Sequence, residues 1–595
     1  REIDAGNFSF AEFYLRRARR IFPAMFFVTG ITLAIGTVLF MPEHVEDLSA
    51  SAIATALFSA NIYFSAFLDT GYFAEDSQTK PLLHMWSLGV EEQFYILWPA
   101  VLLLVAQRPS LARLILGCLI VLSVLLGELL LATERFTFAY YMLPTRVFEL
   151  GAGAYLALSE RAGRGVPSPG MAFVLGIAGL VAVFGSAAML NEARPFPGFN
   201  AVPVTVGTVL LLISGRCPDQ PVARLLSLPP MRWIGFISFS LYLWHWPILA
   251  VQRYFDPNLG AMQQVVSLVG MVLLAAFTYR YVETPLRARK VTAGQVIKRY
   301  FLLPTSVILA LGIFNTATRG VGPWIFGDYA ERLAETPQPA FKFDFICQRP
   351  TLTAEITSNP DCLRGPDNGT GVLLYGDSNA AHFVGAFDVL SDALGFRFRN
   401  VAHSACPPIA GDTHPYTLPR YEQSCADSVA HMKTVLPDYD TVVLAALWAG
   451  HAFRGQGAGA DLRVELGQSV DDLLSAGKRV ILIGEVPSQE NFDGDCFKKH
   501  LKLAFLDCEE VSVDDREPQI SAALRDIAER KEHVYYVDPF PALCNDGRCP
   551  AYREGRPVYF DNSHLSMVGS RLVGDAWLAG RGADLDDLRT ALAWK

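Results

Sequence analysis

The sequence predicts a multi-pass α-helical membrane bundle that is followed by an extracytoplasmic α/β domain. Apolar residues make up 51% of the 595 residues, and before residue 320 they gather in runs long enough to cross a bilayer. Beyond residue 366, short apolar runs alternate with helical patterns, which is typical of a parallel sheet with helices on both faces. Eight of the ten cysteines follow residue 320, as expected for a domain in an oxidising compartment.

We divide the chain into four parts. Residues 1–290 form the membrane domain, and residues 291–320 form a cytoplasmic loop with the transmembrane helix that links the two halves. Residues 321–365 are an extracytoplasmic linker or extension, which is too long for an idle connection. Residues 366–595 form the α/β domain. Its strands are expected at 371–375, 396–402, 440–446, 479–484 and 533–538, with helices at 469–476, 520–531 and 566–578.

The membrane domain and linking helix should together cross the bilayer nine or ten times. The amino-terminal stretch, residues 8–20, holds four arginines beside an apolar run, which marks a cytoplasmic end. A second basic cluster, residues 287–299, precedes the last span, so the chain beyond Gly320 should lie on the opposite side. The expected spans are about 21–40, 50–67, 88–107, 112–132, 138–158, 171–190, 200–214, 234–253, 263–282 and 299–317.

Several polar residues lie where lipid would penalise them. His84 and Glu92 lead into an apolar run, and Arg146 and Glu149 are three residues apart on one helix face, where they can pair. Each is explained equally well as an interfacial anchor or a structural ion pair. As a set facing the interior of one bundle, they favour a functional site. The arginines of the basic stretch can bind an anion such as the phosphates of coenzyme A. They are Arg16, Arg17, Arg19 and Arg20.

A nucleophile and its base are indicated at opposite ends of the α/β domain. Residues 371–379 form an apolar strand that ends in Gly-Asp-Ser-Asn, so a tight turn presents the Ser378 hydroxyl at the carboxyl edge of the sheet. Near the carboxyl terminus, Asp561 stands three residues before His564. A carboxylate in that position can orient the imidazole that deprotonates a serine. The alternative is a turn serine and an unrelated surface histidine.

Three further residues are candidates for contacts with an acceptor. Asn379 follows the nucleophile, and Trp448 and His451 stand where the third strand ends. The latter two can line a sugar platform, or they can be a core tryptophan and a surface histidine. The third strand ends without an asparagine, so we expect an oxyanion to rest on the backbone N–H groups of Ser378 and of residues 404–406.

Four motifs of the first half occur in order: HMWSLGVEEQFYILWP, PTRVFELGAGA, ISFSLYLWHWPI and YVETPLR. Together, across about residues 8–290, they resemble the acyltransferase family 3 membrane proteins. The GDS and DxxH motifs of the second half resemble the SGNH hydrolase family, which implies a flavodoxin-like α/β fold. The fusion of the two resembles the bacterial subclass that O-acetylates lipopolysaccharide O-antigen or peptidoglycan.

The resemblance implies an O-acetyltransferase, multi-pass in the bacterial inner membrane. Acetyl would come from cytoplasmic acetyl-CoA, the co-substrate, and would pass to hydroxyls of a surface polysaccharide in the periplasm. Ser378 would be the nucleophile, His564 the base and Asp561 its orienting carboxylate. The basic stretch matches the family's RxxR region, and Glu92 and Arg146 match residues of its later motifs.

Two departures from the family pattern leave other functions open. The family's first transmembrane helix carries an arginine and a catalytic histidine, and we expect the first helices to be missing from a chain that starts at Arg1. The family's Gly-x-Asn-Asp loop has no match in residues 440–451. The alternatives are an acetyl esterase with the same triad, a glycan-binding module without catalysis, and a membrane transporter with an appended domain.

Cysteine spacing and charge complete the expectations. Neither a CxxC pair nor a histidine cluster accompanies the cysteines, so no metal site is expected. The formal net charge of −9 gives no indication of nucleic-acid binding. The expected partners are the polysaccharide acceptor, acetyl-CoA and membrane lipid. Pairing of neighbouring cysteines predicts disulfides 347–362, 406–425, 496–508 and 544–549.

Overall fold

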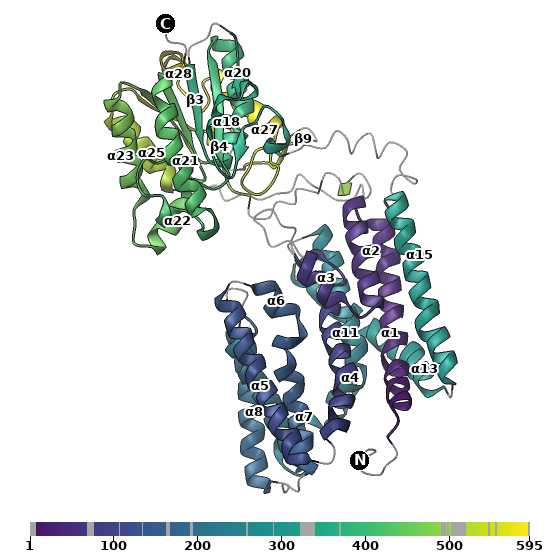
Figure 1. The fold of residues 1–595 in the computed structure, drawn as a ribbon. Helices are drawn as coiled ribbons and strands as arrows, with labels where there is room; N and C mark the ends of the chain where they lie inside the picture. Colours follow the sequence, from purple (N-terminus) through teal and green to yellow (C-terminus); the bar gives the residue numbers. More distant parts are fainter. Residues whose placement is uncertain are drawn as a thin grey trace. The chain divides into compact units, whose positions relative to one another are not determined.

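The computed structural model describes most of the chain, which forms two compact units, residues 1–327 and 328–595. Figure 1 labels the helices and strands of both units. The description leaves out residues 1–7, 68–76, 106–107, 134, 162–166, 191–193, 257–259, 290, 322–338, 368–370, 490–495, 497–498, 501–518, 546–547, 554–555 and 593–595.

The first unit is helical, as predicted. Its longest helix, α1, begins where the Ser9 side chain accepts a hydrogen bond from Glu12 N, a typical amino-terminal cap. The α-helices are α1 (Phe10–Leu39), α2 (Pro42–Ala56), α3 (Ala60–Phe67), α4 (Met85–Val105), α5 (Pro109–Ala132), α6 (Phe136–Tyr141), α7 (Val147–Arg161), α8 (Pro169–Met189), α9 (Val202–Ser214), α10 (Pro221–Leu226), α11 (Pro229–Phe255), α12 (Ala261–Thr278), α13 (Thr284–Ala288), α14 (Ala293–Val296) and α15 (Leu303–Thr318).

Six helices in the described part of this unit are long and apolar enough to cross a membrane. Of the other four expected spans, 88–107 and 200–214 are helical as α4 and α9 but are not among these six, and two are broken. The run 50–67 is divided between α2 and α3 because Phe58 takes a left-handed backbone conformation, with φ 54°. The run 138–158 is divided between α6 and α7 because Pro144 stands in the turn between them. None of the four pieces reaches the roughly 20 residues that a transmembrane helix needs. The six helices are Phe10–Leu39, Ser110–Ala132, Pro169–Met189, Pro229–Phe255, Ala261–Ala288 and Ala293–Thr318.

A buried asparagine holds α15 against α1 and α2, beside which Figure 1 shows it. The Nδ2 atom of Asn315 donates to Thr37 Oγ1 at 3.0 Å and to Ser49 Oγ at 2.9 Å. The Asn315 side chain is fully buried, and burying an amide without such bonds costs about 1–3 kcal/mol. These bonds therefore fix the register of the last helix of the unit against the first two.

The second unit is built on a seven-stranded sheet in the order β1-β4-β3-β5-β6-β7, with β2 also paired to β4. All pairs along that path are parallel, and β2 alone of these strands runs antiparallel to its neighbour. The five expected strands are confirmed to within two residues at each end. The strands are β1 (Gln348–Arg349), β2 (Leu363–Arg364), β3 (Gly371–Gly376), β4 (Arg397–His403), β5 (Thr441–Ala445), β6 (Arg479–Ile483) and β7 (Val534–Val537).

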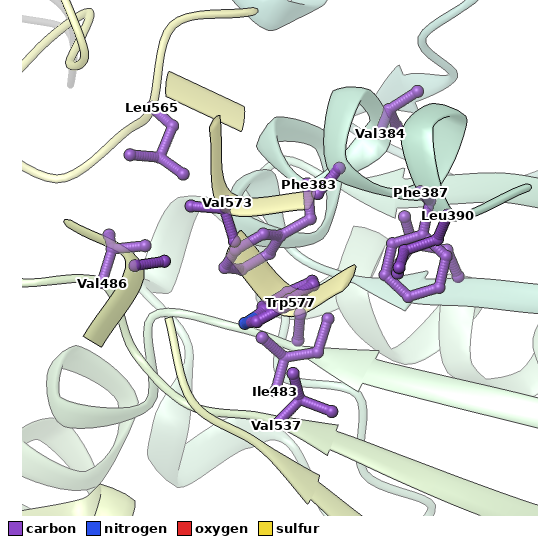
Figure 2. Packing of buried hydrophobic residues seen from close by; sticks show 14 of the residues in the cluster. Phe383, Val384, Phe387, Leu390, Ile483, Val486, Val537, Leu565, Val573 and Trp577 are labelled. Atoms are coloured by element: carbon purple, nitrogen blue, oxygen red, sulfur yellow. The ribbon is translucent and has the colours of Figure 1, made fainter. Parts of the chain in front are cut away.

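Helices cover both faces of this sheet, and each face has its own apolar core. Phe383 stacks on Trp577 with ring centroids 5.8 Å apart, which joins the segment after the nucleophile turn to α27 (Figure 2). Trp577 is completely buried, and its truncation to Ala would cost about 3–5 kcal/mol. The α-helices are α18 (Ala354–Ser358), α19 (Ser378–His382), α20 (Val384–Leu394), α21 (Glu422–Val435), α22 (Trp448–Gly457), α23 (Leu462–Ser475), α25 (Gln519–Arg530), α26 (Phe540–Leu543), α27 (Met567–Leu578) and α28 (Leu585–Leu592).

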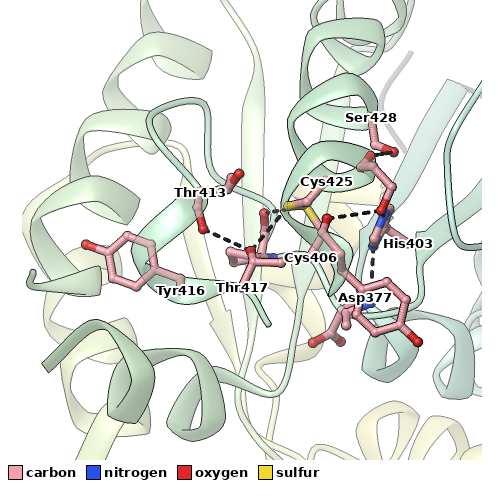
Figure 3. Close-up of a disulfide and its surroundings, with 12 residues drawn as sticks. Asp377, His403, Cys406, Thr413, Tyr416, Thr417, Cys425 and Ser428 are labelled. Carbon is pink, nitrogen blue, oxygen red and sulfur yellow. Dashed lines mark hydrogen bonds between the residues drawn. A yellow bond between two sulfur atoms is a disulfide. The ribbon is translucent and has the colours of Figure 1, made fainter. Parts of the chain in front are cut away.

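Three of the four predicted disulfides are confirmed: Cys347–Cys362, Cys406–Cys425 and Cys544–Cys549. The fourth predicted pair, 496–508, includes a residue outside the described part of the chain. The first disulfide belongs to the segment expected to be a linker, whose two short strands both pair with β4. The described end of that segment is thus part of the α/β fold. Figure 3 shows the second disulfide, which ties the loop after β4 to α21.

Candidate active site

The turn after β3 places Ser378 at the carboxyl edge of the sheet. β3 is buried from its second residue onward and pairs with both β4 and β5. Gly376 closes it, and a Cβ atom there would lie only 1.7 Å from the carbonyl oxygen of Ala445, so only glycine permits this approach of two strands. Asp377 then caps α19, since its Oδ1 atom accepts a hydrogen bond from Asn379 N at 2.7 Å. Ser378 is consequently the first residue of a helix that starts at the sheet edge.

The structure brings the three predicted catalytic residues into one hydrogen-bonded series. The Oγ atom of Ser378 lies 2.7 Å from His564 Nε2. The other ring nitrogen, Nδ1, lies 2.8 Å from Asp561 Oδ2 and 2.9 Å from Oδ1. With Nδ1–H donating to the carboxylate, Nε2 carries the lone pair that accepts the serine proton. This is the arrangement that general-base activation of a serine requires.

The Asp561 carboxylate is held by its own turn. Its Oδ1 atom accepts the backbone N–H groups of Ser563 at 2.8 Å and His564 at 2.7 Å. Burial opposes ionisation of the Asp561 carboxyl, but its hydrogen bond and charge contact with His564, helped by the N–H of Ser563, outweigh burial and lower its pKa. Asp561 is therefore an ionised acceptor at neutral pH, able to stabilise the imidazolium that forms when His564 takes a proton.

The expected oxyanion donors of the loop after β4 are partly engaged elsewhere. Ser404 N donates to Arg349 O at 3.1 Å, and Ala405 N donates to His403 Nδ1 at 3.1 Å. These two N–H groups are therefore not free to act as oxyanion donors in this conformation, and the prediction is wrong for both. The N–H of Ser378 has no hydrogen bond to the described residues, as befits the first position of a helix, and remains the donor nearest to the nucleophile.

The three acceptor-site candidates lie in the protein interior instead of on an open platform. Trp448 has no exposed surface, and its Nε1 atom donates to a backbone carbonyl of β6 at 2.9 Å. Asn379 is 1% exposed, and neither atom of its amide has a partner among the described residues. His451 is 2% exposed and lies between Asp377 Oδ2 and Tyr416 O, at 2.9 and 2.8 Å. The alternative of a core tryptophan is correct, but His451 is not a surface residue.

Two residues near the triad were missed from the sequence. His382 accepts the N–H of Leu565 on Nδ1 at 3.4 Å, and burial first, then the neighbouring His564, lower its pKa well below the ordinary value. Its signal was its place one helical turn after Ser378, on the same helix face. Glu485, just after β6, accepts the N–H of Ala449 on Oε2 at 2.7 Å. Glu485 stands in no recognisable sequence motif, so only the fold reveals that it lies here.

In the first unit, Arg17 joins α1 to α4. Its Nε atom donates to both carboxylate oxygens of Glu92, at 2.8 and 3.0 Å, and an Nη atom lies 3.3 Å from Glu91. Its guanidinium carbon lies 3.4 Å from the centre of the Tyr95 ring. The other arginines of the basic stretch differ: Arg16 and Arg20 are exposed, and the Nε atom of Arg19 is buried without a partner among the described residues.

The remaining membrane candidates form two further groups. Arg146 pairs with Glu149 at 2.6 Å, as expected from their spacing, and its guanidinium lies 4.9 Å from the Trp86 ring centre. His84 is 6% exposed, and neither of its ring nitrogens has a partner in the described part of the chain. Its ring centroid is 5.4 Å from that of His245. The structure therefore pairs Arg17 with Glu92 and Arg146 with Glu149, and it places His84 beside His245.

Both halves of the chain match domains of known proteins. Residues 4–280 match the model of an acyltransferase domain, and residues 346–579 match that of an SGNH domain, described as fused to AT3 domains. The peptidoglycan O-acetyltransferase OatA of Listeria monocytogenes is 31% identical over 291 residues, 46% of each chain. The O-acetyltransferase OatA of Staphylococcus aureus is 28% identical over 316 residues, 50% of this chain and 52% of its own.

The chain thus spans about half the length of the curated relatives it matches. Among solved structures, the periplasmic domain of a lipopolysaccharide acetyltransferase from Salmonella ser. Paratyphi A aligns with 43% of this chain and 95% of its own. That match has 15% sequence identity and a TM-score of 0.31.

Proposed function

We propose that this chain, an acyltransferase domain joined to an SGNH domain of the type fused to AT3 domains, is a surface-glycan O-acetyltransferase. The observation that carries the proposal is the hydrogen-bonded series from Ser378 through His564 to Asp561. It supports a covalent acyl step outside the membrane domain. The printed names of the curated relatives support acetyl as the acyl group and peptidoglycan or a related polysaccharide as the acceptor.

The serine would act in two successive acyl transfers. In the first, Ser378 Oγ bonds to the acetyl carbonyl carbon while His564 Nε2 takes the hydroxyl proton, and the donor's leaving group departs with that proton. In the second, a sugar hydroxyl attacks the acetyl-serine, His564 takes its proton, and Ser378 Oγ leaves with the proton returned. Asp561 stabilises the imidazolium in both steps. Atoms and protons balance, and the enzyme is restored.

The membrane domain would supply the acetyl group. We place its donor, cytoplasmic acetyl-CoA, at the basic amino-terminal stretch, where the buried Nε atom of Arg19 has no partner among the described residues and Arg17 is paired with Glu91 and Glu92. Guanidinium groups suit phosphate oxygens. Residues 1–290 would use the donor, and residues 291–320 would connect the two sides of the bacterial inner membrane. Residues 321–365 would extend the α/β domain, and residues 366–595 would act on the acceptor in the periplasm.

The experiment is transfer from radiolabelled acetyl-CoA to an oligosaccharide by membranes that contain the full-length protein. Ser378→Ala should abolish labelling of the acceptor, whereas Ser358→Ala, an exposed serine on α18, should leave it unchanged. If Ser378→Ala membranes label the acceptor normally, the acyl-serine step is wrong.

The same triad would make the chain an acetyl esterase if water were the acceptor. The products distinguish the two functions. Labelled oligosaccharide that increases with acceptor concentration supports the transferase, and labelled free acetate that is indifferent to the acceptor supports the esterase.

A further inference from the structure

The carboxylate of Asp377, beside the nucleophile, is shared between two helices. Its Oδ1 atom caps α19 through Asn379 N, as described above. Its Oδ2 atom accepts the N–H of Leu447, just before α22, at 2.9 Å. The same Oδ2 atom lies 2.9 Å from His451 Nε2. Asp377 is 2% exposed, so its carboxylate depends on hydrogen bonds from protein groups in place of water. These hydrogen bonds also fix the turn that carries Ser378.

The contacts of His451 determine where its protons lie. Nδ1 is 2.8 Å from the carbonyl oxygen of Tyr416, and Nε2 is 2.9 Å from the carboxylate of Asp377. The carboxylate of Asp377 can only accept, so Nε2 of His451 donates to it. Arg454 Nη1 lies farther away, 3.3 Å from Nδ1 and 3.4 Å from Tyr416 O, and can donate to that carbonyl without using Nδ1 as an acceptor.

Three other ionisable groups surround this pair. Arg454 lies on the same helix as His451. Glu485, beyond β6, caps α22 through Ala449 N. His403, at the end of β4, lies near Asp377 and the loop disulfide (Figure 3), and its neutral ring adds no charge, because burial lowers its pKa to about 4. Of these groups, His451 is the one whose side chain donates directly to the Asp377 carboxylate.

We propose that His451 is a positioning residue for Ser378, acting through Asp377, and this inference rests on the function proposed above. The hydrogen bond from His451 fixes the Asp377 carboxylate, which fixes the start of α19 and thereby both the Oγ atom and the backbone N–H of Ser378. Two histidine–carboxylate pairs therefore reach the nucleophile turn, one through Ser378 Oγ and the other through Asp377. His564–Asp561 moves the proton, and His451–Asp377 keeps the serine in place.

The consequence of losing the His451 donor follows from the geometry. Without it, Oδ2 of Asp377 keeps only the N–H of Leu447, and a buried carboxylate loses one of its three hydrogen bonds. The turn can then shift toward another donor. A displacement of about 1 Å at a reacting atom costs about 100-fold in rate, whereas substrate binding elsewhere is unaffected. We therefore expect the loss in kcat, with KM nearly unchanged.

The test compares His451→Leu with His451→Gln in the full-length protein in detergent, with 4-nitrophenyl acetate as the probe. The Leu variant should lose about 100-fold in kcat at constant KM. The Gln variant should recover much of this, because its amide N–H can donate to Asp377. His414→Leu, an exposed histidine of the same unit, is the control. The thermal unfolding midpoint of each variant shows whether it is folded.

The pattern of kcat and KM separates positioning from a general loss of structure. A positioning residue gives a loss that is confined to kcat and that the Gln amide recovers. A partly unfolded protein would lose turnover that a donor in place of His451 does not restore.

Each outcome decides something definite. Wild-type kcat in a folded Leu variant, or a folded Gln variant with no higher kcat than the Leu variant, overturns the positioning role and leaves the proposed function intact. A fluorophosphonate provides the second measurement, since it labels an activated serine without an acceptor. A wild-type protein that neither turns over nor labels at Ser378 overturns the proposed function, and the inference with it.

Discussion

Ser378 and His564 are 186 residues apart in the chain, yet the Oγ atom of one lies 2.7 Å from the Nε2 atom of the other. Two different elements produce this contact. Ser378 is fixed by the start of α19 at the sheet edge, and His564 by the Asp561 turn before α27. α20, which follows α19 almost directly, packs against α27, and the Phe383–Trp577 stack lies between them. The hydrophobic core therefore sets the distance between nucleophile and base.

Asp561→Asn should lower kcat by about 10⁴-fold with little change in fold, because the amide can donate to Nδ1 of His564 and stabilise the tautomer that cannot accept the serine proton. The measurement is steady-state turnover of 4-nitrophenyl acetate by the full-length protein. Asp575→Asn, at an exposed position of α27, is the matched control. Turnover within tenfold of the wild type would mean that Asp561 does not orient the base.

Gly376→Ala should destabilise the α/β unit by about 3 kcal/mol or more, since the new Cβ atom would lie 1.7 Å from Ala445 O and two paired strands would have to separate. Gly467→Ala on α23, where nothing lies within 4 Å of the new atom, should stabilise by about 0.5–1 kcal/mol. Urea unfolding midpoints measure both. Equal midpoints for the two variants would contradict this account of the nucleophile turn.

Local pattern predicted much of the fold. The alternation of apolar strands and helices located five strands to within two residues, and neighbour pairing of cysteines located three disulfides. The short strands β1 and β2 were missed because two residues have no periodicity. The spans expected at 50–67 and 138–158 are each divided between two helices, because an apolar run in the sequence does not reveal a backbone break such as that at Phe58.

The site was predictable only where the chemistry has a local motif. Ser378, His564 and Asp561 stand in short patterns whose roles follow from residue type. His451 was named for its place at a strand end but given the wrong environment, because its burial depends on Asp377 and Tyr416, which are distant in the sequence. Glu485 was missed because only the sheet order β5-β6 brings it beside α22.

Removing the Cys406–Cys425 disulfide by a double change to Ser should cost about 3 kcal/mol, since the bond closes a loop with a sequence separation of 19. Removing Cys544–Cys549, with a separation of 5, should cost about 2 kcal/mol. We also expect only the first change to lower kcat, because its loop adjoins His403 and Asp377 (Figure 3). Unfolding and turnover of the two double variants provide the comparison. A larger catalytic loss from the second would contradict it.

Glu485 should make the protein less stable as pH rises. Burial, with the Asp377 carboxylate nearby, raises the pKa of Glu485 from its ordinary value of 4.5 to about 7 in the folded protein. Between these values the folded state binds more protons than the unfolded state, so its contribution is full below about pH 4.5 and falls by about 3 kcal/mol as pH rises to 7. His403 has the opposite effect. Its pKa is lowered from 6.5 to about 4, so acidification across this range lowers the stability of the folded protein.

A difference measurement isolates the glutamate. The unfolding free energy of the wild type minus that of Glu485→Gln should decrease by about 3 kcal/mol from pH 4.5 to 7.5, because His403 is the same in both proteins. Glu355→Gln, at an exposed position of α18, should give a difference that does not change with pH. A flat difference for Glu485→Gln would show that this carboxyl titrates normally.

The Arg17–Glu92 pair offers a test of donor binding in the membrane unit. Arg17→Gln leaves the largely buried Glu92 without its ion partner, at a cost of about 3–5 kcal/mol. The double change Arg17→Gln and Glu92→Gln removes both charges and should restore most of the stability.

If the arginine also binds donor phosphates, acetyl transfer from acetyl-CoA stays low in the double variant although the protein is stable. Full recovery of transfer would make the pair structural alone. Turnover of 4-nitrophenyl acetate at Ser378 should be the same in all three proteins, and Arg232→Gln, at an exposed position of α11, is the control.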